Sequence, residues 1–198
     1  MKFLLNIILL LVCCSGVLQA QESLFNRFIN SFDKMKVPFA IDENYMSSRY
    51  DNPDKFRQMD PIFFEFIFDE KDKQRILATC GGYGDIKEKL HHVFIGRPAI
   101  SPKFHSVVYA ETLIDETGDN TTYYLNTYSL DGNLISRTAL AKFENIGTSA
   151  VSEGYIFGLE NIFKINKVYK NPESIQSLSK MKLKINNRGK VTERQVSG

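Results

Sequence analysis

Alternating apolar and polar residues, joined by short turns that contain glycine, dominate the second half of this 198-residue chain. The clearest example is TTYYLNTYSL (121–130) and NLISRTALAKF (133–143), which flank Asp131 and Gly132. An Asp-Gly pair between two such segments predicts a β-hairpin, because the tight turn requires a positive backbone φ at its centre. This part of the chain is therefore expected to form antiparallel sheet.

Other segments of the same kind predict the remaining strands. They are residues 62–68 (IFFEFIF), 75–80, 91–95, 104–114, 154–169 with a break at Gly158, 180–185 and 190–196, with turns at 69–74, 115–120 and 187–189. No helix-length segments separate these strands, which excludes a doubly wound parallel sheet. We predict a mainly β fold in one domain, an antiparallel meander of eight to ten strands. It forms a strongly curved sheet, a sandwich or a partly closed barrel.

One amphipathic helix is predicted before the strands, over residues 22–35. Its apolar residues recur at spacings of three and four, and they are Leu24, Phe25, Phe28, Ile29, Phe32 and Met35. Pro38 disfavours helical geometry at the residue before it. Residues 41–61 are polar and are expected to be irregular, with at most one helical turn near Lys55 to Met59.

The N-terminal residues 1–20 have the layout of a secretory signal peptide. Lys2 precedes an apolar run, and Leu-Gln-Ala precedes Gln21 as in a signal-peptidase site. The run is shorter than the roughly 20 residues of a membrane span. We expect an exported protein, periplasmic or secreted, whose mature domain is 21–198. Lipid attachment at Cys13 or Cys14 is the alternative, and neither cysteine follows the small residue that this modification prefers.

The stretch ATCGGYGD (78–85) holds Cys80, the one cysteine outside the N-terminal segment. A cysteine nucleophile needs a nearby base, and His91, His92 and His105 are the candidates. Cys80 also ends an apolar alternating run, where a free cysteine commonly behaves as a small buried side chain. We interpret the stretch as the end of a strand, with a thiol enzyme or Cys/His hydrolase as the alternative.

Other chemistry is poorly supported. The glycines of 78–85 lack the G-K-[ST] of a phosphate loop. His91 and His92 are adjacent in a predicted strand and so point to opposite faces, which disfavours a metal site. No cofactor is implied. Glu65, Glu111 and Glu160 lie in strand-like segments, and glycosidases use pairs of acids on strands. The polar face of any alternating strand also carries acids, so a catalytic pair is poorly supported. Asn120-Thr121-Thr122 fits a glycosylation acceptor in a predicted turn.

Charge is unevenly distributed along the chain. From Lys164 to Arg194 there are nine Lys or Arg residues and two acids. Lys180, Lys182 and Lys184 could therefore contact an anionic surface, although lysines also protect sheet edges from aggregation. Tyr123, Tyr124 and Tyr128 are candidate aromatic ligand contacts, with ordinary cross-strand packing as the competing interpretation. Binding of nucleic acid is disfavoured by the nearly neutral charge.

The C-terminal half resembles exported proteins of unknown function from Bacteroidetes-type bacteria. The resemblance rests on YYLNTYSLDGNLISRTALAKF, SEGYIFGLENIFKI and KLKINNRGKVTE. It implies a secreted, β-rich protein and carries over no catalytic or ligand residues. We therefore expect a non-catalytic protein that binds a protein, glycan or small molecule in the cell envelope, or is a structural part of it. A carrier of a small apolar ligand is a further alternative.

Overall fold

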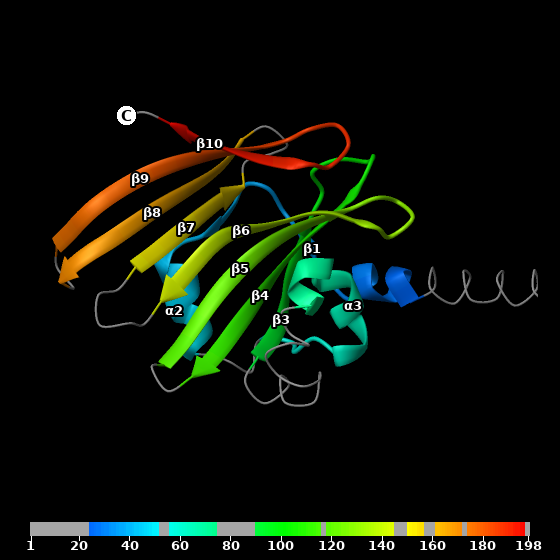
Figure 1. Ribbon diagram of the computed structural model, residues 1–198, viewed down its shortest axis with the longest axis horizontal. Coiled ribbons are helices and arrows are strands. Elements are labelled where there is room, and N and C mark those ends of the chain that lie inside the picture. Colours follow the sequence, from blue (N-terminus) through cyan, green and yellow to red (C-terminus); the bar gives the residue numbers. More distant parts are fainter. Residues whose placement is uncertain are drawn as a thin grey trace, which may run out of the picture.

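A strongly curved sheet that does not close dominates the fold (Figure 1). The computed structural model describes residues 24–51, 56–74, 90–115, 118–144, 150–156, 161–171 and 174–196. Its elements are β1 (Lys34–Met35), β2 (Phe39–Ile41), α2 (Glu43–Asp51), η2 (Pro61–Phe63), α3 (Phe64–Ile67), β3 (Leu90–Pro98), β4 (His105–Asp115), β5 (Gly118–Tyr128), β6 (Leu134–Glu144), β7 (Ala150–Ile156), β8 (Ile162–Asn171), β9 (Ser174–Ile185) and β10 (Val191–Val196). Residues 24–30 and 70–74 are also helical.

The sheet confirms the predicted antiparallel meander. Strands β3 to β10 are neighbours in chain order, and each pairs antiparallel with the next. The two short strands that precede β3 in the chain do not follow this pattern. β1 pairs parallel with β3, and β2 pairs antiparallel with β7. Of the three predicted architectures, the open curved sheet is the one that forms.

Both glycine turns lie where the sequence predicts them. Gly132 has φ of 92° between β5 and β6, and Gly189 has φ of 84° between β9 and β10. A side chain is disfavoured in this left-handed region. Gly132 is also crowded, because a Cβ atom there would lie 2.8 Å from the ring of Phe25. These two turns set the register of the hairpins that carry the surfaces described below.

The predicted strand at 62–68 is wrong, because this segment forms η2 and α3. Asp60 caps the segment by accepting a hydrogen bond from the Ile62 amide, and Pro61 occupies the first helical turn, where its missing N–H does no harm. Phe64, Phe66 and Ile67 are all buried, so the apolar residues fit one side of a short helix as well as a strand. The predicted turn at 69–74 is also helical from residue 70.

Other boundaries differ from the predictions. Helix 22–35 is described from residue 24 and ends at 30, and Met35 lies in β1. The predicted irregular region holds α2, a nine-residue helix without a strong amphipathic pattern. Segment 154–169 belongs to two paired strands, β7 and β8. β5 begins at Gly118, so Asn120 to Thr122 lie in a strand and not in a turn.

Two apolar clusters cover opposite faces of β4 and β5. Val107 and Tyr109 point to the face that is covered by helix 24–30, η2 and α3. Val108 and Ala110 point to the other face, where they pack with α2, β2 and β7 to β9. Figure 1 shows α2 and α3 on these two sides of the sheet. Both faces of the central strands are therefore buried.

Candidate functional site

A group of charged and polar side chains lies on the α3 side of the sheet. We call Asp72, His92, Tyr109, Glu111 and Arg137 the arginine cluster. The register places His92 of β3 opposite Glu111 of β4, two residues along from Tyr109 on the same face. Arg137 reaches this face from β6, and Asp72 reaches it from helix 70–74. Four segments that are distant in sequence therefore meet at one point.

Arg137 lies at the centre of this cluster, and each of its three guanidinium nitrogens donates a hydrogen bond. Its Nε donates a hydrogen bond to the Tyr109 hydroxyl at 2.8 Å, Nη1 to Asp72 Oδ2 at 2.6 Å and Nη2 to Glu111 Oε2 at 2.9 Å. Its guanidinium carbon lies 3.8 Å from the ring centroid of Tyr124. The planar guanidinium fork suits this combination of carboxylate pairing and aromatic stacking, and an ammonium group would not reproduce it.

His92 lies beside this arginine and is closed off from solvent. Its imidazole is 0% exposed, and Nε2 lies 3.0 Å from Glu111 Oε2. The rings of Phe64 and Phe68 lie 4.8 and 5.5 Å away by their centroids. Nδ1 has no hydrogen-bond partner among the described residues. His92 therefore lies in an aromatic surround with a carboxylate at one nitrogen.

The arginine cluster attaches the helical segment to the sheet. Tyr109 also donates to the carbonyl of Ile67 at 3.4 Å, and Tyr128 donates to the carbonyl of Phe66 at 2.7 Å. Burial raises the pKa of the Tyr109 hydroxyl well above its usual value, although Arg137 acts in the opposite direction. A phenol in this state is not a nucleophile at neutral pH. The described contacts fit a structural role, with Arg137 joining β4 and β6 to Asp72.

The alternative of a thiol enzyme involves Cys80, which lies outside the described residues, and three histidines that the structure describes. His91 alternates with His92 and points to the other face of β3, and His105 is the first residue of β4, six residues before Glu111. Burial, with a smaller contribution from Arg97, lowers the pKa of His105. The three histidines are therefore at three different places.

Of the three glutamates in strand-like segments, two lie in the part of the chain that the structure describes. Glu65 is exposed on α3, whereas Glu111 belongs to the arginine cluster. Glu160 lies outside the described residues. Within the described ranges, no three His, Cys, Asp or Glu side chains are placed to hold a metal ion. No helix in those ranges is both long and apolar enough to cross a membrane.

The three candidate tyrosines are parts of the core. Tyr123 and Tyr128 are 1% and 0% exposed, and they belong to the two different apolar clusters. Tyr124 is half-buried, and its ring stacks on Tyr109 with centroids 5.4 Å apart. Cross-strand packing and contact with Arg137 account for these rings in the folded chain.

A second polar cluster fixes α2 to β7 and β8. Lys167 Nζ lies 3.1 Å from Glu43 Oε1 and 2.9 Å from Glu153 Oε1. Tyr169 donates a hydrogen bond to Glu43, and this bond lowers the pKa of Glu43. Burial opposes the charge of Lys167, but its hydrogen bonds to both carboxylates outweigh burial and raise its pKa. The cation is again paired with carboxylates within the described residues.

The last hairpin carries cations that are not matched in this way. On one face of β9 and β10, Lys182 lies opposite Arg194, and Lys184 opposite Thr192. Lys180 continues the row, and we call Lys180, Lys182, Lys184 and Arg194 the basic face. No ion pair joins any of the four to another described residue. The other face of β9 holds the buried Leu183 and Ile185, as the alternation predicts.

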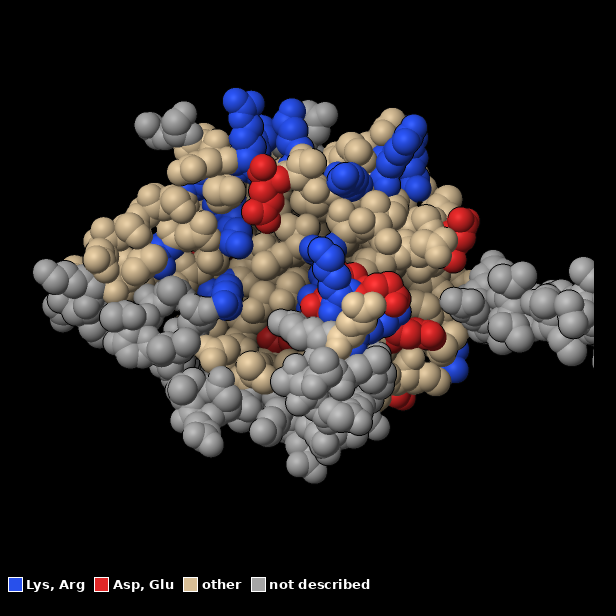
Figure 2. All heavy atoms as spheres, in the orientation of Figure 1, with Lys and Arg blue, Asp and Glu red and all other residues tan. Residues whose placement is uncertain are grey.

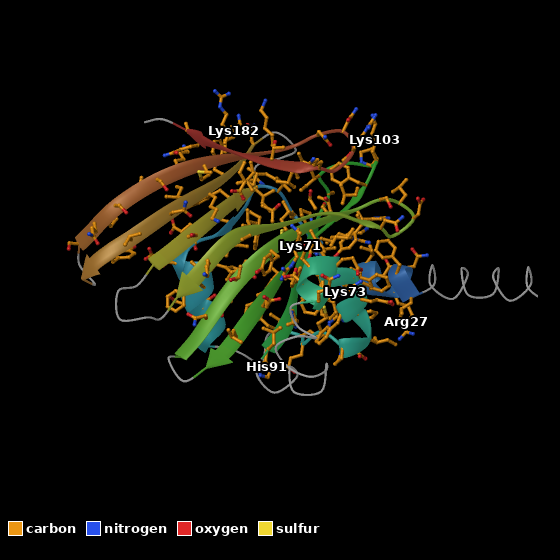
Figure 3. The ribbon with its side chains drawn as sticks, in the orientation of Figure 1. Arg27, Lys71, Lys73, His91, Lys103 and Lys182 are labelled. Atoms are coloured by element: carbon orange, nitrogen blue, oxygen red, sulfur yellow. The ribbon has the colours of Figure 1, made fainter. Side chains whose placement is uncertain are left out.

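The basic face lies at the outer edge of the molecule. Figure 2 shows Lys and Arg side chains gathered along the upper edge, over β9 and β10. Figure 3 shows Lys182 pointing away from the sheet there, while Lys71 and Arg27 lie on the helical side. Lys180 and Lys182 lie over one ring, with Nζ atoms 4.7 and 5.6 Å from the centroid of Phe163. This surface is open to a partner.

Comparison with protein-family models, with curated proteins and with solved structures finds no match for this chain.

Proposed function

We propose that the protein is a non-catalytic, exported component of the bacterial cell envelope that acts by binding through the basic face. The observation that carries this proposal is the direct cross-strand opposition of Lys182 and Arg194. Like charges at such a position destabilise a sheet, and an acid or a neutral residue would remove the repulsion. Four cations without a described acidic partner fit a surface whose counter-charge comes from another molecule.

The contrast with Arg137 and Lys167, the cations of the two polar clusters, supports this choice of surface. Arg137 and Lys167 each lie beside two carboxylates. The cations that hold segments of this fold together therefore have acidic partners, and those of the basic face have none among the described residues. β10 is also the final strand of the sheet, and its residues from Thr192 onward are exposed. An edge strand with outward cations resists self-aggregation and remains available to a partner.

The layout of residues 1–20 supports export. The same proposal expects the mature chain to begin at Gln21 and to carry no lipid at Cys13 or Cys14. The intact mass of the exported product measures both points at once. A mass increase corresponding to a diacylglycerol-modified cysteine would show that the protein is attached to the membrane by a covalent lipid, which contradicts this part of the proposal.

Sedimentation with isolated bacterial envelopes tests the binding surface. The mature protein is expected to pellet with envelopes at about 0.1 M salt and to be released at about 1 M, where charges are screened within a few ångströms. The variant K180Q/K182Q/K184Q/R194Q should remain in the supernatant. The matched control R27Q/K34Q/K36Q/K71Q removes four exposed cations elsewhere and should pellet like the wild type. Equal pelleting of the two variants would contradict the proposal.

A further inference from the structure

We infer that the partner of the basic face is the anionic headgroup layer of a lipid bilayer, on which the last hairpin lies. This inference rests on the proposed function and names its partner. The charges alone would suit any polyanion. The choice of a membrane comes from the exposed aliphatic side chains that share the face.

Leu178 and Val196 extend the basic face at one end. Side chains alternate along β9, so Leu178 points to the same side as Lys180 and Lys182. Val196 lies directly opposite Lys180 on β10. Leu178 is 61% exposed and Val196 37%, and Leu178 is the most exposed large apolar side chain among the described residues. Interfacial membrane segments combine Lys and Arg with exposed apolar side chains such as leucine, and this end of the hairpin has both kinds of residue.

Phe163 places the lysine ammonium groups above an apolar base. The Nζ atoms of Lys180 and Lys182 both lie over its ring, so the two ammonium groups are held together above an apolar side chain. A headgroup phosphate can then meet the ammonium groups while Leu178 enters the acyl boundary. A soluble acidic glycan offers no apolar phase for Leu178, and it would leave this side chain in water.

Electrostatics set the expected strength of the interaction. A Lys or Arg residue near an anionic leaflet contributes roughly a five-fold factor to partitioning, so four of them give on the order of a hundred- to a thousand-fold. This attraction decays over a Debye length of about 10 Å at 0.1 M salt. Binding should therefore require anionic lipid and fall steeply with added salt, and only the part due to Leu178 should persist.

A single introduced tryptophan is a direct reporter, because the chain has none of its own. Leu178→Trp places an indole at the expected depth, and Leu130→Trp is the matched control. Leu130 is 57% exposed at the β5–β6 turn, and Figure 1 shows that turn at the opposite end of the sheet from the start of β9. The probes are vesicles of phosphatidylcholine alone and vesicles with about a third phosphatidylglycerol, with and without brominated acyl chains.

The inference predicts that the indole of the Leu178→Trp variant shifts its emission to the blue and is quenched by brominated lipid, with the anionic vesicles only. The emission of the Leu130→Trp variant should not change. Adding K180Q/K182Q/K184Q/R194Q to Leu178→Trp should lower its partition coefficient at least a hundred-fold. Circular dichroism of each variant confirms that it is folded. Absence of a shift for Leu178→Trp with anionic vesicles overturns the inference, and so does an equal shift for Leu130→Trp.

The two proposals fail in different ways. A protein that pellets with envelopes through the basic face but ignores anionic vesicles has a protein or glycan partner, which overturns the lipid inference and keeps the proposed function. A protein whose envelope binding does not depend on the basic face overturns the proposed function. A charged soluble glycan can also be added as a competitor for envelope binding, at a concentration of charged groups equal to that of the lipid phosphates. Full competition by the glycan, together with no blue shift of the Leu178→Trp variant on vesicles, overturns the lipid inference as well.

Discussion

Replacement of Arg137 by Met should show how strongly the arginine cluster holds the helical segment on the sheet. The side chain of Arg137 is 10% exposed, and those of Asp72 and Glu111 are 15% and 13% exposed. Methionine keeps the apolar stem but leaves both carboxylates without their cation. Removal of one partner from a buried ion pair lowers stability by about 3–5 kcal/mol, a large part of the roughly 5–15 kcal/mol of a typical domain.

Urea unfolding followed by circular dichroism measures this loss. With a slope of about 1–3 kcal/mol per molar urea, the midpoint should fall by more than about 1 M. Adding Asp72→Asn and Glu111→Gln to Arg137→Met should recover at least half of the loss, because no buried charge then lacks a partner.

Lys73→Met is the matched control for this experiment. Lys73 forms an ion pair with Glu70 at 2.8 Å, but the Glu70 side chain is 81% exposed. Exposed pairs contribute about 1 kcal/mol or less. If Arg137→Met cost no more than Lys73→Met, the cluster would not hold the helical segment, and the structural interpretation of its contacts would be wrong.

Three further predictions concern packing and titration. Phe66→Ala should lower the free energy of unfolding by about 3–5 kcal/mol, against less than about 1 kcal/mol for the exposed Ile62→Ala, and a small loss at Phe66 would contradict its burial. Gly154→Ala should cost about 1–3 kcal/mol, because its Cβ would lie 2.5 Å from Leu140 Cγ, and a neutral effect would show that the neighbouring strand yields. Burial lowers the pKa of His105 in the folded state, so the unfolded chain binds this proton more tightly, and stability should fall as pH decreases through 6.5. His105→Gln should flatten this pH dependence of stability. A pH dependence that is the same in the variant as in the wild type would contradict the contribution of His105.

The hairpins could be predicted because their signals are local. Gly132 and Gly189 each occupy a positive φ that the turn demands, and alternation on either side identifies the strands. The basic face follows from the same rule, since the period of two places Lys180, Lys182 and Lys184 together. Where strand, turn and burial depend on neighbouring residues alone, the sequence is sufficient.

The prediction for 62–68 is wrong because the apolar residues of this segment are nearly continuous. Such a segment does not distinguish a strand from a buried helix by periodicity. The cap at Asp60 followed by Pro61 is the available signal for a helix start. α2 lacks a periodic apolar pattern, and Met46 holds it instead by packing into the apolar cluster that contains Ile41. Tertiary contact decides both elements.

The arginine cluster could be predicted only in part. His92 and Glu111 are candidates from the sequence, but for separate chemistries, and nothing in the sequence joins them. Arg137 lies between Ser136 and Thr138 in an alternating strand, where a polar residue ordinarily faces water. Its contact with Asp72 spans 65 residues. Only the register of β3 to β6 brings these side chains to one face.

Lysine footprinting on bacterial envelopes tests the central claim most directly, because it needs no substitution. The mature protein is acetylated with and without envelopes, and each lysine is quantified by mass spectrometry. The proposed surface predicts that Lys180, Lys182 and Lys184 become protected several-fold, while Lys71 and Lys103 keep their reactivity. Unchanged reactivity at the three β9 lysines, with protection at Lys71, would place the binding surface on the helical side and contradict the account.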